Sequence, residues 1–315
     1  MKIVLPGGSG HIGSALVRAF VRDGHECVVF TRRPTGDGLA REVAWNGRTR
    51  GAWFAEIDGA DVVINLAGRT VDCRYNEKNL REMMDSRVDS TRVVGEAIAA
   101  AARPPRVWLQ AGTATVYAHR YDAANDEVTG IIGDPPGMPA LWKRSVDIGL
   151  AWEKALANAP TPRTRKVALR TSLVMGPAQG GVFRVLARLA KMGVGRQGDG
   201  RQYVSWIHEE DFVAAVGFLI AREDISGAVN IASPHPLPNR ELMAVLHAAV
   251  GMPVALPVPT WALEIGAMFM RTETELILKS RRVVPGRLLQ AGFNFRYPSW
   301  PEAAEDLVAR CSRGR

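Results

Sequence analysis

Short apolar runs alternate with longer segments of helical periodicity along most of this chain. The apolar runs are rich in β-branched and aliphatic residues and lie near residues 2–5, 26–30, 62–66, 106–110, 167–172 and 228–231. Runs that are apolar at successive positions, such as 62–64, are typical of strands covered on both faces. Strands that alternate with helices predict an α/β fold with a Rossmann-type, doubly wound parallel sheet.

The pattern changes after Gly176 and Pro177. A helix near 182–191 precedes a glycine-rich loop at 193–200 and a long final part rich in Pro, Leu and Met. This part predicts a smaller, discontinuous C-terminal lobe over the carboxyl edge of the sheet, where open α/β sheets bind ligands. We therefore assign residues 1–175 to the Rossmann core, with 204–233 returning to it, and residues 176–203 and 234–315 to a substrate-binding lobe.

A glycine-rich turn separates the first apolar run from the helical pattern at 14–23. Glycines in such a turn let the backbone bend tightly, approach a pyrophosphate and pack a helix on a strand, and the helix N-terminus offers free N–H groups to the phosphates. A strand before the turn and a helix after it are the context that a dinucleotide site requires. The predicted cofactor contacts are Gly7, Gly8, Ser9, Gly10, His11, Ile12 and Gly13.

Two arginines at the end of the second apolar run indicate which dinucleotide binds. NAD-preferring folds place a carboxylate there for the ribose 2′-hydroxyl, whereas this chain has Thr31, Arg32 and Arg33. Guanidinium groups bind a 2′-phosphate in bidentate fashion, so the predicted cofactor is NADP(H). The segment after the third run is expected to pass close to the same cofactor, at Leu66, Ala67 and Gly68.

Composition narrows the class of protein. Hydrophobic residues make up 47% of the 315, which is ample for a buried core. The net charge of +8 comes from scattered basic residues that are not interleaved with aromatics, which disfavours nucleic acid as a partner. The densest basic cluster, 163–166, is predicted to be a solvated loop. We expect a small-molecule ligand and a monomer or homodimer.

Neither a secretory signal nor a membrane span is expected, because the first apolar run ends at Pro6 and no basic region precedes it. The default is a cytoplasmic protein with no membrane partner. Cys27, Cys73 and Cys311 are far apart and lack metal-ligand spacing, so we expect reduced, structural thiols and no metal.

Further motifs follow the predicted strands and give the chain a family resemblance. They are the glycine turn, the segments 65–68, 113–117 and 205–211, and Arg170 ahead of Gly176 and Pro177. With these motifs the chain resembles the extended short-chain dehydrogenase/reductases, the NAD(P)-dependent epimerase/dehydratase superfamily. Segments 198–202, 280–285 and 291–298 resemble the "epimerase family" subgroup, which ends in a domain of unknown function. The resemblance implies a Rossmann core, a discontinuous substrate lobe and NADP(H).

The chain departs from that superfamily at the residues that transfer protons. The superfamily uses a Ser or Thr, a Tyr and a Lys four residues after the Tyr, and the Lys lowers the pKa of the phenol. Thr113 matches the first, but none of the five tyrosines has a lysine at that spacing. Alignment on Trp152 and Glu153 places Ser145 at the Tyr position and Gly149 at the Lys position. At these two positions we expect a void or ordered waters, or a shift of register that brings Lys143 or Lys154 to the site.

Other groups are candidates to replace the missing pair. His119 follows Tyr117 by two residues, and an imidazole titrates near neutrality, so Thr113 and His119 are the catalytic candidates. Arg87 stands where the family carries Asn, either to bind an anionic substrate or to form a core ion pair. The pocket candidates are Arg87, Thr113, Ser145, Gly149 and His208.

Charged residues near these candidates have simpler interpretations. Glu209, Glu210 and Asp211 are expected as charges in the first turn of a helix that begins after His208. Lys143 and Asp147 lie four apart, a spacing that favours a surface ion pair.

Two functions follow from the sequence. One is an NADP(H)-dependent oxidoreductase or epimerase-like enzyme on a small molecule, with proton chemistry that does not use the Tyr/Lys pair. The other is a non-catalytic NADP(H)-binding sensor or interaction protein, in which loss of the pair marks loss of turnover. NADPH oxidation on addition of small carbonyl compounds would separate them.

Overall fold

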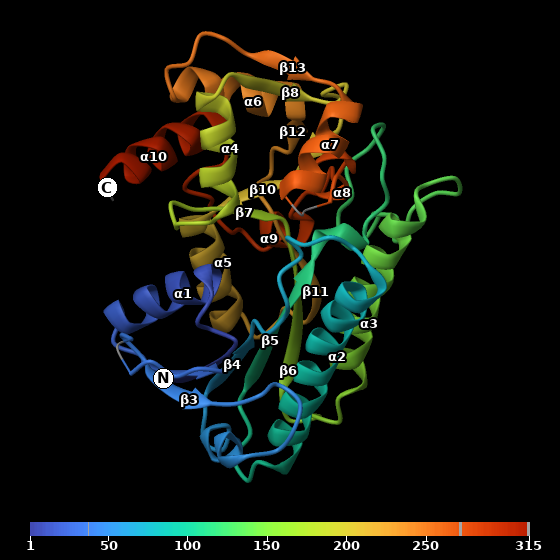
Figure 1. The fold of residues 1–315 in the computed structure, drawn as a ribbon. Helices are drawn as coiled ribbons and strands as arrows, with labels where there is room; N and C mark the ends of the chain where they lie inside the picture. Colours follow the sequence, from blue (N-terminus) through green and yellow to red (C-terminus); the bar gives the residue numbers. More distant parts are fainter. Residues whose placement is uncertain (37, 271–272, 314–315) are drawn as a thin grey trace.

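A seven-stranded, all-parallel sheet forms the centre of the molecule, as the apolar runs predict. The computed structural model describes residues 1–36, 38–270 and 273–313. The strand order is β11-β6-β5-β4-β1-β2-β3, and every neighbouring pair is parallel (Figure 1). The strands are β1 (Lys2–Pro6), β2 (Glu26–Thr31), β3 (Arg41–Ala44), β4 (Val62–Asn65), β5 (Val107–Thr113), β6 (Arg165–Thr171) and β11 (Gly227–Ile231). The Rossmann-type fold class is confirmed.

Helices cover both faces of the sheet (Figure 1). On one face lie α1 (His11–Arg22) and α5 (Glu209–Ala221), and on the other α2 (Glu77–Ala100) and α3 (Ala140–Asn158). Successive residues of a strand point to opposite faces, so Ile3 and Leu5 join the core under α1 and α5, whereas Val4 joins the core under α2 and α3. This two-sided burial explains why the strands are apolar at successive positions.

The edge strand β3 was not predicted. Its sequence begins with two charged residues, Arg41 and Glu42, and none of its residues is buried. Short, charged strands of this kind are typical of sheet edges, where they discourage pairing with another chain. Periodicity identifies buried strands well, and an exposed edge strand carries little of that signal.

The basic cluster at 163–166 is a solvated loop only in part, because Arg163 lies in an exposed turn whereas Arg165 and Lys166 begin β6. Arg163 donates to the carbonyls of Ala101 and Ala102 just beyond α2, and Lys166 donates to those of Ala157 and Ala159 around the end of α3. Arg165 donates to carbonyls at the end of α5 and before β11. The last carbonyls of a helix lack intrahelical partners and carry partial negative charge, which these cations satisfy.

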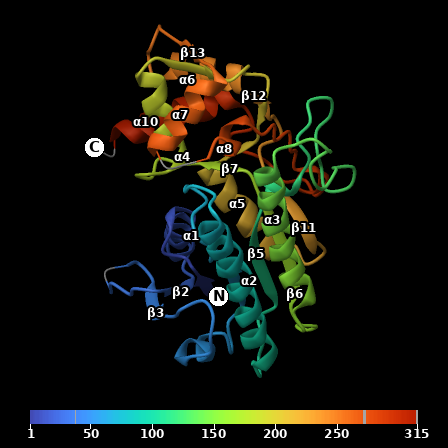
Figure 2. The ribbon, with the colours of Figure 1, turned by 45° about the vertical axis from the view of Figure 1, so that its right-hand side comes forward.

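The smaller lobe has its own apolar core around Phe183 and Trp300, and Trp206, from the segment 204–233 expected to return to the Rossmann core, packs into this second core. Its helices are α4 (Val182–Lys191), α6 (Asn239–Ala249), α7 (Thr260–Met270), α8 (Glu275–Leu278) and α10 (Trp300–Arg313), whereas Leu288 of α9 (Gly286–Gln290), assigned to the lobe from the sequence, packs into the core under α1 and α5. Short strand pairs connect them: β7 (Leu173–Met175) with β10 (Trp206–His208), β9 (Tyr203–Val204) with β12 (Leu237–Pro238), and β8 (Val194–Gln197) with β13 (Leu256–Val258). Figures 1 and 2 show this lobe beyond one end of the sheet.

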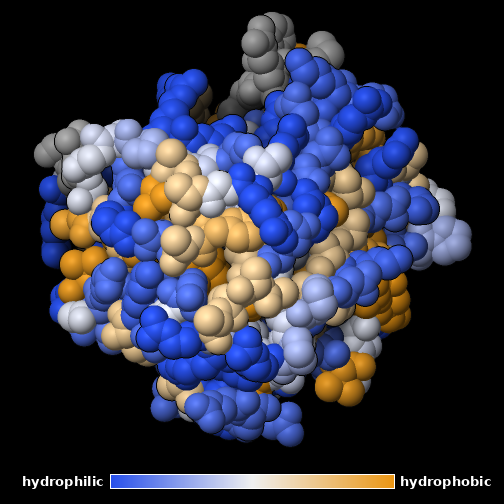
Figure 3. All heavy atoms as spheres, turned by 90° about the horizontal axis from the view of Figure 1, so that it is seen from below, coloured by the Kyte–Doolittle hydropathy of each residue, from blue (hydrophilic) through white to orange (hydrophobic). Residues whose placement is uncertain are grey.

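The face of the molecule seen in Figure 3 is mostly hydrophilic, with apolar residues in small patches. Within the described residues, no helix combines the length and the apolar composition needed to cross a bilayer.

Candidate functional site

A cavity of about 520 Å³ lies where the core meets the smaller lobe. One end is formed by the glycine turn and by the segment after β4, and the other by polar side chains from α2, α3 and the lobe. Its lining includes Gly7, Gly10, His11, Ile12, Gly13, Leu66, Gly68, Tyr75, Arg87, Thr113, Ser145, Gly149, Glu275 and Arg281. Residues far apart in the chain therefore share one continuous space.

The glycine turn has the shape that a pyrophosphate needs. Gly7 has φ +74°, and a Cβ there would come within 2.7 Å of Ala67. At Gly13 a Cβ would overlap the carbonyl of Gly8, so helix and turn pack without side chains. Gly10 precedes α1 as a cap without a side-chain hydrogen bond, and a Cβ on it would meet nothing within 4 Å. The first N–H groups of α1 thus face open space, which fits a phosphate.

The other predicted cofactor residues lie around this turn but do not all line the cavity. Gly8, Ser9 and Ala67 are outside its lining. Thr31 is buried at the end of β2, and its Oγ1 accepts a hydrogen bond from the Arg33 amide at 3.4 Å. The Arg32 and Arg33 side chains are exposed there, and neither forms an ion pair within the described part of the chain. They fit an adenosine 2′-phosphate, and their contact with it stays a prediction.

Thr113, Ser145 and Gly149 share the cavity wall, as the alignment predicts. The Gly149 position has no room for a side chain, because a Cβ there would lie 2.6 Å from Val116 Cγ1 and 3.0 Å from Thr113 Cγ2. The expectation of a void in place of the lysine is therefore wrong at this position, since neighbouring side chains have closed over it.

Ser145 has partners that the sequence did not indicate. Its Oγ donates to Glu275 Oε2 at 2.5 Å, and its hydroxyl is hydrogen bonded with the phenol of Tyr75. Both partners are buried, and burial raises the pKa of each. Ser145 and Glu275 are 130 residues apart and share no motif, so only the fold brings them together.

Arg87 is buried, and its side chain reaches the cavity. Nη1 donates to the Met83 carbonyl at 3.0 Å, and the guanidinium lies 5.0 Å from the centre of the Trp152 ring. Desolvation lowers the pKa of Arg87 to about 10. The core ion pair weighed from the sequence is not found, because no described carboxylate lies within ion-pair distance of this guanidinium.

His119 is not in the cavity, which corrects its candidacy as the catalytic base. Its Nδ1 accepts a hydrogen bond from the Ser280 amide at 2.8 Å, and its ring packs against Tyr121 and Trp142. Burial lowers the pKa of His119, which favours the neutral ring that accepts this bond. Through the hydrogen bond with Ser280, the imidazole connects the loop around His119 to the segment that begins at Ser280.

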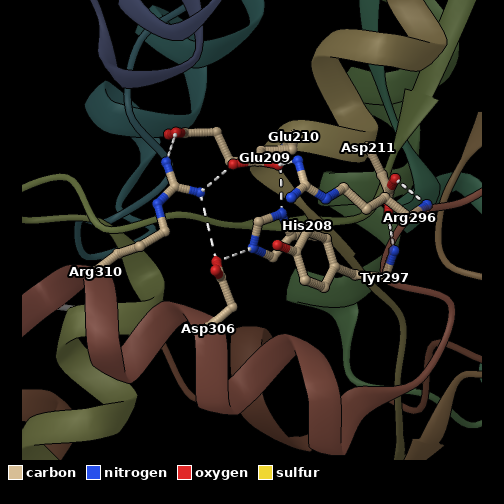
Figure 4. Close-up of polar contacts among 8 residues, drawn as sticks. All are labelled: His208, Glu209, Glu210, Asp211, Arg296, Tyr297, Asp306 and Arg310. Carbon is tan, nitrogen blue, oxygen red and sulfur yellow. Dashed lines mark hydrogen bonds and ion pairs between the residues drawn. The ribbon is translucent and has the colours of Figure 1, made fainter.

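His208 is also outside the cavity lining, so its prediction as a pocket residue is corrected. Figure 4 shows its ring between the start of α5 and α10. Nδ1 accepts from the Glu210 amide at 3.1 Å, which caps α5, and Nε2 lies 3.1 Å from Asp306 Oδ2. Glu209, Glu210 and Asp211 form the first turn of α5, as predicted.

Charged residues that the sequence pointed to, namely Glu153, Lys143 and Asp147, form ion pairs. Glu153, aligned with the family glutamate, accepts two hydrogen bonds of 2.8 Å from Arg170, which also donates to the Tyr117 hydroxyl. Lys143 and Asp147 form the predicted surface pair at 3.1 Å. Across the residues that the structure describes, no group of His, Cys, Asp and Glu is arranged to hold a metal ion.

Known proteins share both the sequence pattern and the fold. Residues 3–232 match the family model of the NAD dependent epimerase/dehydratase family, and residues 258–307 match DUF1731, a domain of unknown function. The epimerase family protein SDR39U1 of Mus musculus is 30% identical over 98% of this chain and 100% of its own length. For the epimerase family protein Mb2239 of Mycobacterium bovis, identity is 33% over 96% of this chain and 95% of the relative.

A solved structure agrees with these matches. The crystal structure of the human epimerase family protein SDR39U1 with NADPH has a TM-score of 0.84 and 25% identity, covering 98% of this chain and 99% of that one. The resemblance drawn from the motifs is confirmed: the chain belongs to the NAD-dependent epimerase/dehydratase family.

Proposed function

We propose that this protein is an NADP(H)-dependent oxidoreductase that acts on a small anionic carbonyl or hydroxyl compound. The observation that carries the proposal is the single cavity that joins the glycine turn to a polar pocket under the smaller lobe. Glu275, Leu276 and Arg281 of that lobe line this cavity, which supports the assignment of residues 176–203 and 234–315 to substrate binding.

The residues at the glycine turn suit NADP(H). The pyrophosphate would lie over Gly10 at the N-terminus of α1, and the 2′-phosphate beside Arg32 and Arg33 at the end of β2. The human relative was crystallised with NADPH, which supports the same choice for this chain. When bound, the cofactor supplies or accepts a hydride.

Arg87 indicates the charge of the substrate. A buried guanidinium without a carboxylate partner among the described residues is costly to keep, and an anionic ligand would offset that cost with charge-assisted hydrogen bonds. We therefore favour substrates with a carboxylate or phosphate close to the carbonyl.

A second candidate is a non-catalytic NADP(H) sensor. The observation in its favour is the packing at Gly149, where Val116 and Thr113 leave no space for the lysine of the superfamily. A sensor would bind NADPH with the same residues but would not oxidise it when carbonyl compounds are added.

Titration calorimetry tests cofactor binding. NADPH should bind about tenfold to hundredfold more tightly than NADH, because a charge-assisted contact contributes about 1.5–3 kcal/mol. Replacing both Arg32 and Arg33 with Ala should remove most of the preference. Gly10→Ala should weaken both cofactors while leaving the melting temperature unchanged, since the added methyl meets no protein atom. Equal affinities for the two cofactors would contradict this assignment.

Turnover is tested by following NADPH oxidation with a panel of short 2-oxo acids and their amides. We expect oxidation with some of the acids and weaker or no oxidation with the matched amides. Tight NADPH binding with no oxidation by any carbonyl would favour the sensor.

A further inference from the structure

We propose that Glu275 is the proton donor and acceptor of this site, in place of the tyrosine that the chain lacks. This inference rests on the proposed function and names the group that would exchange a proton with the oxygen of a substrate. Glu275 begins α8 in the smaller lobe, so the acid would come from the element that covers the cavity.

The position of the carboxyl supports this role. Glu275 is 3% exposed and lines the cavity. Its Oε2 accepts a hydrogen bond from the Ser145 hydroxyl at 2.5 Å. Ser145 stands at the position of the superfamily tyrosine, so Glu275 lies beside the place where that phenol would act. Its Oε1 is buried and accepts no hydrogen bond from the described residues, with Arg281 Nη2 as its charged neighbour at 3.6 Å. A buried polar atom without a partner calls for a ligand, and a substrate hydroxyl or carbonyl would supply one.

Two cations lie near Glu275, but both are also bound to other groups, so they neutralise the charge of its carboxylate only in part. Arg281 Nη2 lies 3.6 Å from Oε1, while Nη1 of the same guanidinium donates to the carbonyls of Glu275 and Leu276. Lys279 is bound to Asp134 at 2.7 Å and to the Thr115 carbonyl. Burial raises the pKa of Glu275 against the opposing effects of Arg281, of the hydrogen bond from Ser145 and of Lys279, and Asp134 raises it further.

Tyr75 is a poorer donor. Its phenol faces both Ser145 and Glu275, and burial raises its pKa well above the usual value. A phenol catalyses proton exchange when a nearby cation lowers its pKa, and at Tyr75 desolvation outweighs the opposing effect of Arg281. We assign Tyr75 and Ser145 to positioning the carboxyl.

The proposed step balances with the hydride already named. Reduction breaks the C=O π bond, the carbonyl carbon receives the hydride with its two electrons, and the oxygen takes the proton of Glu275. The products are an alcohol, the oxidised cofactor and the Glu275 carboxylate, which regains a proton from water. In the reverse direction the carboxylate removes the hydroxyl proton.

The test compares Glu275→Gln with Glu264→Gln, an exposed glutamate of α7 in the same lobe. With an oxo acid that the wild type reduces, Glu275→Gln should lower kcat about 100-fold or more, since general acid catalysis contributes at least that factor. Its dissociation constant for NADPH should match that of the wild type. Glu264→Gln should match the wild type throughout. The wild-type rate should fall as the pH rises through the pKa of Glu275, because only the protonated form donates.

Infrared difference spectroscopy gives a readout independent of turnover. The wild type near neutral pH should show a protonated carboxyl C=O stretch that Glu275→Gln lacks and Glu264→Gln keeps. If the two variants give the same carboxyl band, Glu275 is ionised by Arg281 and the proposal is overturned. If Glu275→Gln retains turnover, the proposed role of Glu275 is wrong but the proposed function still stands. If the wild type reduces no carbonyl compound, the proposed function itself is contradicted.

Discussion

Single residues decide what the cavity can hold. Arg87 and Glu275 are both buried, yet neither has the close, two-sided ion pair that Glu153 makes with Arg170. Buried charges are usually paired, and exceptions concentrate at sites that bind ligands or move protons. These two side chains therefore distinguish this cavity from an ordinary packing defect.

Arg87→Met should separate ligand binding from stability. Methionine keeps most of the unbranched stem of the side chain and removes a desolvated charge, so the melting temperature should stay the same or rise. Affinity for a bound oxo acid should fall about tenfold to hundredfold, by loss of a charge-assisted contact of about 1.5–3 kcal/mol. Thermal unfolding and calorimetric titration measure the two effects. An unchanged affinity for the oxo acid would remove Arg87 from the substrate site.

Gly149→Ala should destabilise the protein by about 1–3 kcal/mol, because the new methyl would overlap Val116 and Thr113 in a packed wall. The matched control is Gly217→Ala in α5, where a Cβ meets nothing within 4 Å and should stabilise the helix by about 0.5–1 kcal/mol. Urea unfolding of both variants measures the difference. If Gly149→Ala proves as stable as the control, the wall yields easily and a lysine at this position would fit after all.

Elements are held at their ends by long basic side chains. Arg163, Arg165 and Lys166 come from one short segment and donate to carbonyls at or just beyond the ends of three helices. Part of the net positive charge thus lies on side chains that bind carbonyls at helix C-termini. The net charge is therefore weaker evidence for an anionic partner.

Arg165→Met tests whether these basic side chains stabilise the helix ends that they contact. It should cost about 1.5–3 kcal/mol, because the carbonyls of Leu219 and Ile225 lose a charged donor. Arg22→Met is the control, since Arg22 forms only an exposed pair with Asp23 and should change stability by less than about 0.5 kcal/mol. Urea midpoints with unchanged slopes measure both effects. A loss no larger than that of the control would mean that water replaces the arginine at these carbonyls.

At the scale of the whole molecule, polar contacts join the core to the smaller lobe. His208 at the start of α5 reaches Asp306 of α10, and Arg310 of α10 lies 3.1 Å from Glu210 and 3.3 Å from Glu209 (Figure 4). These contacts hold α10 against the start of α5 at the boundary between the two parts.

The His208 contacts predict how stability depends on pH. Its Nδ1 accepts the Glu210 amide, so a second proton on the ring would break the cap of α5, and burial lowers the pKa of His208 from 6.5 to about 4. Between these values the unfolded chain binds a proton that the folded chain does not. This contribution to stability is complete above pH 6.5 and decreases toward pH 4, by at most about 3 kcal/mol.

His208→Asn measures this contribution. Asparagine keeps a side-chain cap for α5 but does not titrate, so the variant should lose less stability than the wild type between pH 6.5 and pH 4. Urea unfolding at several pH values gives the two slopes. Parallel slopes for wild type and variant would show that His208 is not responsible for the pH dependence.

Local sequence determined the parts of this protein that depend on near neighbours. Periodicity located the buried strands within a few residues, and the glycine turn with its strand and helix identified the cofactor end, because Gly7 and Gly13 meet constraints set within the same turn and the segment beside it. The missing Tyr-x-x-x-Lys spacing is likewise visible in the chain itself.

The tertiary structure alone decided which groups face one another. The sequence around a histidine does not show what its ring contacts, and the structure places His119 against Ser280 and His208 against Asp306, both outside the cavity lining. Glu275 gave no signal because its partner Ser145 lies 130 residues away. Burial and electrostatic environment depend on segments brought together from across the chain, and so the chemistry at the substrate end of the cavity could be read only from the fold.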